Sequence, residues 1–62
     1  MARKSWLESL IQDEDKAISE YIELAEGFKV MGEKKFSKLA LGLAKDEQRH
    51  KEILIQILES LK

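Results

Sequence analysis

Apolar residues recur every three or four positions along almost the whole chain, and the pattern breaks near Gly32. This spacing is typical of one face of an α-helix. It predicts one helix from about residue 6 to about residue 31, and a second from about residue 33 to about residue 61. Proline is absent, and lysine and glutamate, which favour helices, are abundant. The chain is therefore predicted to be all-α.

The residues at the predicted helix ends indicate how the two helices are joined. Ser5 followed by Glu8 matches a capping box, with Ser5 as the N-cap of the first helix. Gly32 is expected to adopt the left-handed conformation that often follows a helix. Because the connection is so short, the helices are expected to fold back as an antiparallel hairpin. Residues 1–62 would form a single helical-hairpin domain.

The small size of the chain indicates that the hairpin needs a partner. A chain of 62 residues is marginally stable alone, and the absence of cysteine removes disulfides and metal–thiolate sites as a remedy. Two helices cannot enclose a core between them, and each apolar stripe is wide enough to need more than one neighbour. The simplest solution is a homodimer with twofold symmetry, in which two hairpins form a four-helix bundle; larger even-numbered assemblies remain open.

The charge balance and hydropathy bear on the other classes of partner. The formal net charge is −1, from 11 basic and 12 acidic residues. This balance gives no reason to expect a nucleic acid or an anionic membrane as partner. No apolar run approaches the roughly 20 residues of a membrane span. A soluble cytoplasmic protein is the expectation.

Three residues with charged or metal-binding side chains interrupt the apolar stripes when each helix is written in sevens. The seam positions of the first helix are Leu7, Glu14, Tyr21 and Phe28, with Leu10, Ala17, Leu24 and Met31. Those of the second helix are Phe36, Leu43, His50 and Ile57, with Ala40, Glu47, Leu54 and Leu61. A carboxylate without a partner in an apolar core costs several kcal/mol, so Glu14, Glu47 and His50 require compensation.

The three exceptions are predicted to lie at the same height in the hairpin. Glu14 comes 18 residues before Gly32, whereas His50 comes 18 and Glu47 15 residues after it. At a rise of about 1.5 Å per residue, they fall within about one turn of each other. A twofold dimer would bring the mid-helix positions of both chains together, giving four glutamates and two histidines. This is the ligand set of a dinuclear carboxylate centre, and it suits iron or manganese better than a closed structural zinc site.

The pattern Glu14-x2-Ala17-x3-Tyr21-x3-Ala25, then Gly32, then Glu47-x2-His50, resembles the first helical hairpin of rubrerythrins and other ferritin-like proteins. The resemblance spans roughly residues 10–58. It implies a ferritin-like four-helix bundle and a centre of two iron ions per dimer, with manganese or zinc as other candidates.

The resemblance also implies a role for each matching residue. Glu14 would be a terminal carboxylate ligand, Glu47 would bridge the two metals, and His50 would bind one metal through a ring nitrogen. Tyr21 would donate a hydrogen bond to a ligand carboxylate and so help to orient it.

The chain departs from the family in two respects. Family members usually carry two such hairpins in one chain, so here dimerisation must supply the second. The cysteine-ligated rubredoxin-like iron module of full rubrerythrins is absent, and with it the internal electron donor. Encapsulated ferritins, which are also short two-helix chains, build their sites between subunits.

Simpler interpretations stand beside these. Glu47 and His50 could lie at a solvated helix edge, and Tyr21 could be ordinary core packing. Glu20, Glu23 and Glu26 are expected to be solvent-facing charges, and Asp13 and Asp46 to point away from the site.

Two classes of function follow. The first is a non-haem di-iron carboxylate protein that handles O₂, peroxide or ferrous iron, as an oxidoreductase of the peroxidase or ferroxidase type. The second is a protein without redox chemistry, either a helical-hairpin dimerisation module whose polar residues specify register or a dimer held by a structural metal.

Overall fold

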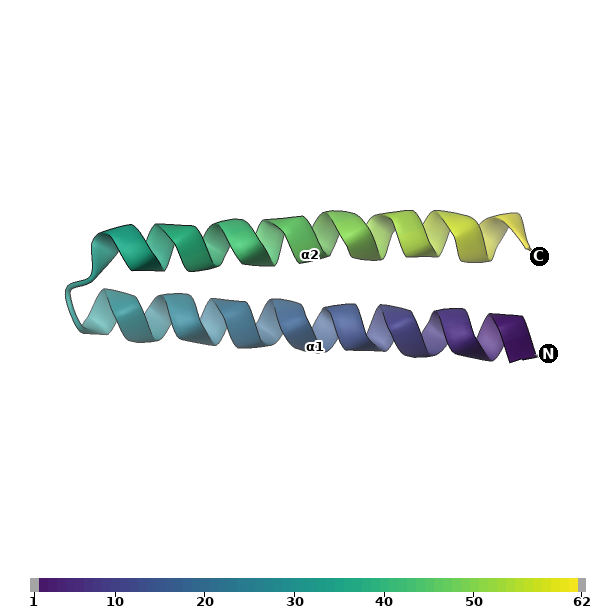
Figure 1. Cartoon of the computed structure of the whole chain (residues 1–62), viewed down its shortest axis with the longest axis horizontal. Coiled ribbons are helices and arrows are strands. Elements are labelled where there is room, and N and C mark those ends of the chain that lie inside the picture. The colour runs from purple at the N-terminus through teal and green to yellow at the C-terminus, as the bar shows by residue number, and fades with distance from the viewer. Residues whose placement is uncertain (1, 62) are drawn as a thin grey trace.

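The structure, a computed structural model, describes residues 2–61. It contains helix α1, Ala2–Val30, and helix α2, Lys34–Ser60. The helices lie side by side and run in opposite directions, so both chain ends lie at the end of the rod opposite the turn (Figure 1). The rod measures 47 × 14 × 9 Å along its principal axes. The predicted all-α antiparallel hairpin is therefore confirmed; Met1 and Lys62, the ends of the predicted 1–62 domain, lie outside the described residues.

The turn between the helices is built around Gly32, as predicted. Gly32 has a φ of 82°, and its N–H donates to the carbonyl of Lys29 at 3.1 Å. The N–H of Glu33 donates to the carbonyl of Phe28 at 2.8 Å. These two bonds form a Schellman motif, which satisfies the last carbonyls of α1 and reverses the chain direction.

The predicted start of the first helix is wrong. The helix begins at Ala2, so Ser5 lies inside it and cannot be its N-cap. Ala2, Arg3 and Lys4 all favour helix and none of them ends one, so the helix extends past the capping-box pattern.

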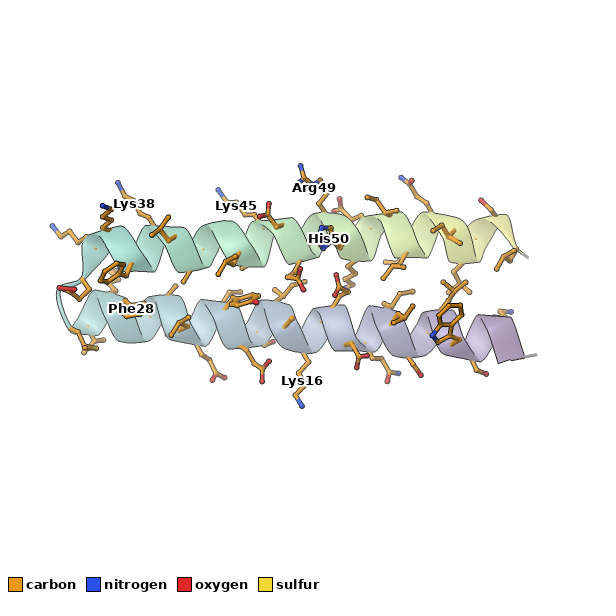
Figure 2. The ribbon with its side chains drawn as sticks, viewed as in Figure 1. Lys16, Phe28, Lys38, Lys45, Arg49 and His50 are labelled. Atoms are coloured by element: carbon orange, nitrogen blue, oxygen red, sulfur yellow. The ribbon has the colours of Figure 1, made fainter. Side chains whose placement is uncertain are left out.

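Small side chains pack between the helices in the half of the hairpin nearer the turn, and Leu7 is buried toward its other end. Ala25 of α1 and Ser37, Ala40 and Ala44 of α2 are buried, and the Ser37 hydroxyl donates to the carbonyl of Ala25 at 2.8 Å. The rings of Phe28 and Phe36 close this end of the hairpin, with centroids 5.5 Å apart and planes inclined by 52°. The position of Phe28 beside the turn can be followed in Figure 2.

The contact between the helices is rotated from the predicted seam. We define the contact seam as the buried or partly buried positions along which each helix meets the other, namely 7, 11, 14, 18, 21, 25 and 28 in α1 and 37, 40, 44, 47, 51, 54 and 58 in α2. In α1, Ala25 is 2% exposed and the neighbouring Leu24, predicted for the seam, is 46% exposed. The predicted seam is the face that a four-helix bundle would bury, and the hairpin contact occupies only part of each wide apolar stripe.

The other half of each stripe forms an uncovered surface, which we call the His50 face. It comprises Leu10, Ala17 and Leu24 of α1, Met31 of the turn, and Phe36, Leu43, His50 and Ile57 of α2. Most of these side chains are exposed in the single chain. On the opposite side of the contact seam, Ile18, Ile22, Leu41, Ala44, Lys45 and Gln48 line an open groove of about 270 Å³, which we call the groove face. The residues predicted for one seam thus divide between the contact seam and the His50 face.

Within residues 2–61, neither helix has a stretch that is long and apolar enough to cross a membrane.

The role of Gly32 can be tested by substitution with alanine. Gly32→Ala should lower the free energy of unfolding by about 1–2 kcal/mol, because a side chain disfavours a positive φ. Gly42→Ala is the matched control, since Gly42 lies inside α2 and its Cβ position is open. The control should raise stability by about 0.5–1 kcal/mol. Urea unfolding of both variants measures the difference, and equal stability of the two would contradict this account of the turn.

Candidate metal centre

The structure brings together the three predicted metal ligands. Glu47 and His50 are three residues apart in α2 and therefore share one side of that helix, while Glu14 reaches them from α1. His50 Nδ1 lies 3.0 Å from Glu47 Oε1 and 3.4 Å from Glu14 Oε2. One ligand atom from each residue lies within 4.8 Å of the other two. Figure 2 shows His50 far from the turn, along the middle part of α2.

The three side chains differ in their burial within the single chain. The side chains of Glu14 and Glu47 are 20% and 21% exposed, because both occupy the contact seam. The His50 side chain is 53% exposed in the single chain, because it belongs to the His50 face and not to the contact seam. The cluster is therefore enclosed by the hairpin on one side and open on the other.

Two separations within the cluster fit ligands around one metal ion. Neighbouring ligand atoms bound at about 2.0–2.2 Å in octahedral or tetrahedral geometry lie about 2.8–3.6 Å apart. The distances from His50 Nδ1 to the two carboxylates, 3.0 and 3.4 Å, match this spacing. An ionised carboxylate can only accept a hydrogen bond, so Nδ1 carries a proton when it bonds to Glu47. A cation bound at Nδ1 would take the place of that proton, and the neutral imidazole would then carry its proton on Nε2.

Three ligand residues do not complete the coordination of a pair of metals. Within residues 2–61, Glu14, Glu47 and His50 are the group of carboxylates and imidazoles that converge in this way. Asp13 and Asp46 are exposed and stay outside the group, as expected.

The remaining predicted residues lie apart from the cluster. Tyr21 is partly buried on the contact seam, and among the described residues its hydroxyl makes no side-chain hydrogen bond. Its orienting role stays a prediction. Glu20, Glu23 and Glu26 are exposed, as expected for solvent-facing charges.

Sequence reasoning missed an ion pair beside the ligands. Lys51 Nζ lies 2.6 Å from Asp15 Oδ1, and this ion pair links α2 to α1. Lys51 directly follows His50 in sequence, and Asp15 directly follows Glu14. A second pair, Arg49 with Asp46 at 3.6 Å, lies within α2 and is well exposed. The inward position of Lys51 could have been recognised from the sequence, since residue 51 is seven positions after the small residue Ala44 and falls on the same side of the helix.

Comparison with known families gives a match over most of the chain. The family model described as Rubrerythrin matches residues 5–62, a span that includes α2, nearly all of α1 and all three converging side chains. No curated protein and no solved structure gives a match. Because the family match covers almost the entire sequence, the chain belongs to the rubrerythrin family.

Proposed function

We propose that two copies of this chain form a ferritin-like four-helix bundle that holds two iron ions and handles O₂, peroxide or ferrous iron. The observation that carries the proposal is the convergence of Glu14, Glu47 and His50 from two helices in a member of the rubrerythrin family. One hairpin supplies two carboxylates and one imidazole. Two hairpins supply four carboxylates and two imidazoles, the protein ligand set of a dinuclear carboxylate centre.

Charge balance supports a centre shared by two chains. Four ionised glutamates would carry a charge of −4, and two divalent ions would neutralise it. Without cations, these partly buried carboxylates would repel one another and lose the solvation they have in water. Metal binding would thus remove a cost that the apolar helices cannot offset.

The His50 face is the surface that the second chain would cover. Its exposed leucines, isoleucine and aromatic side chain surround the open side of the metal-ligand cluster. A twofold axis passing near His50 would bury this face against itself and bring the two clusters together. The same contact that completes the ligand set would therefore complete the hydrophobic core.

The side chains have separate tasks in this proposal. Glu14 and Glu47 neutralise and position the ions, with Glu47 in the bridging role that the family resemblance implies. His50 contributes a neutral nitrogen ligand, and Tyr21 orients a carboxylate of the centre. The bound iron pair supplies the redox chemistry, while the apolar bundle limits access of water. Peroxidase and ferroxidase activity both fit this arrangement.

Metal content measured together with native mass tests the proposal. Protein purified without a metal-binding tag and loaded with Fe(II) should contain about one iron per chain in an even-numbered assembly. A fully folded dimer that binds no metal would contradict the proposal and favour the helical-hairpin dimerisation module. A zinc-loaded dimer inert to Fe(II), O₂ and peroxide would favour a structural metal.

Removal of each ligand should abolish metal binding. Glu14→Ala, Glu47→Ala and His50→Ala should each lose most of the bound iron, whereas Glu20→Ala, which removes an exposed carboxylate, should keep it. After chelation, the two glutamate variants should be at least as stable as the wild type, because each deletes a partly buried, mutually repelling charge. Elemental analysis and thermal unfolding measure both effects. Normal iron content in Glu14→Ala would show that α1 does not contribute to the site.

Two similarly exposed leucines allow the dimer face to be identified. Leu43 on the His50 face is 45% exposed, and Leu41 on the groove face is 43% exposed. Leu43→Asp should dissociate the dimer and release iron, because it would bury an unpaired charge in the proposed interface. Leu41→Asp should leave the dimer and its iron content unchanged. Native mass and iron content provide the measurement, and the opposite pattern would place the interface on the groove face.

A further inference from the structure

The ion pair between Lys51 and Asp15 is placed where it can control the geometry of the metal ligands. Asp15 follows Glu14 in α1, and Lys51 follows His50 in α2. Lys51 Nζ and Asp15 Oδ1 are 2.6 Å apart. Apart from the contacts of His50, this is the ion pair that links the two helices among the described residues. It spans the hairpin at the level of the ligands.

Lys51 occupies a position where a lysine needs a specific reason. It lies on the contact seam in line with Ser37, Ala44 and Leu58, and its side chain is only 24% exposed. Placing an ammonium group there costs desolvation, which a partner at hydrogen-bonding distance offsets in part. The lysine stem packs along the seam while its charged end reaches Asp15. The pair therefore fixes how the two helices face each other at this level.

The pair adds a link between the helices at the ligand level, in the half of the hairpin away from the turn. The turn and the Ser37–Ala25 hydrogen bond hold the helices together at one end. The cluster lies 18 residues from Gly32, about 27 Å along the rod. There Glu14 and Glu47 face each other across the seam, and two ionised carboxylates repel. That repulsion acts to separate the helices where the ligands must meet.

We propose that Lys51 and Asp15 form a positioning pair that holds α1 and α2 at the spacing at which Glu14 meets Glu47 and His50. The inference rests on the proposed function, since it concerns the affinity of the same metal centre. Neither residue belongs to the converging ligand group. Their effect is to set the cluster in a binding geometry before the ion arrives, which reduces the reorganisation that binding requires.

The test compares metal affinity in variants that remove or reverse the pair. Lys51→Met keeps the stem and removes the charge, and Asp15→Asn removes the opposite charge. Each should weaken Fe(II) binding by the dimer about two- to fivefold, the range expected for one partly exposed ion pair. Chelator competition measures the affinity, and native mass and circular dichroism check the assembly. The double variant Asp15→Lys with Lys51→Asp should recover most of the lost affinity.

Arg49→Met is the matched control. It makes the same kind of change on the other side of His50, but Arg49 pairs with Asp46 inside α2 and links no helices. It should bind Fe(II) as the wild type does. Affinity of Lys51→Met equal to that of Arg49→Met, or a charge-swapped variant as weak as the single variants, would overturn the inference.

Amide hydrogen exchange in the metal-free protein separates this inference from the proposed function. Lys51→Met should speed exchange around Glu14 and Glu47 about two- to fivefold, with no change near Ser37. If the wild type binds no metal but this local change occurs, the pair positions the helices and the di-iron proposal fails. Unchanged exchange around the cluster would overturn the positioning role whatever the metal content.

Discussion

Two packed helices can cover only one side of each other, and this constraint governs the rest of the molecule. The contact seam buries small side chains near the turn, but the second half of each apolar stripe stays open on the His50 face. A 62-residue hairpin without cysteine gains no stability from disulfides. A partner surface, a bound metal or both can supply the missing stabilisation. The position of His50 on the open face means that one event, pairing of two hairpins, can supply both.

The architecture could be predicted from the sequence because it depends on local signals. Helical periodicity, the absence of proline and a single glycine at the turn are sufficient for an antiparallel hairpin, and Gly32 adopts the predicted positive φ. Counting residues from the turn was sufficient to bring Glu14, Glu47 and His50 together, because antiparallel helices joined by a short turn have a fixed register. The capping box failed because helix-favouring residues precede Ser5 and carry the helix past it.

The rotation of each helix could not be predicted in the same way. A stripe that contacts two neighbours in a bundle has two halves, and periodicity alone does not say which half meets the neighbour in the same chain. The buried Ala25 and Ser37 show which half meets the other helix, because small side chains allow two helices to approach closely. Leu24 and Phe36 lie beside this contact and are exposed. For the same reason, periodicity did not separate His50, which is half exposed in the single chain, from the contact seam, and Lys51 was overlooked on that seam.

The central claim is that two chains share one dinuclear iron centre. Mössbauer spectra of the dimer, loaded with ⁵⁷Fe and oxidised, test it most directly, because two bridged ferric ions couple magnetically and two separate ions do not. Antiferromagnetic coupling of two ferric ions in one centre predicts a diamagnetic ground state, seen as a quadrupole doublet with no internal magnetic splitting in an applied field. Spectra of isolated high-spin ferric ions, with full magnetic splitting at low temperature, would contradict a shared centre.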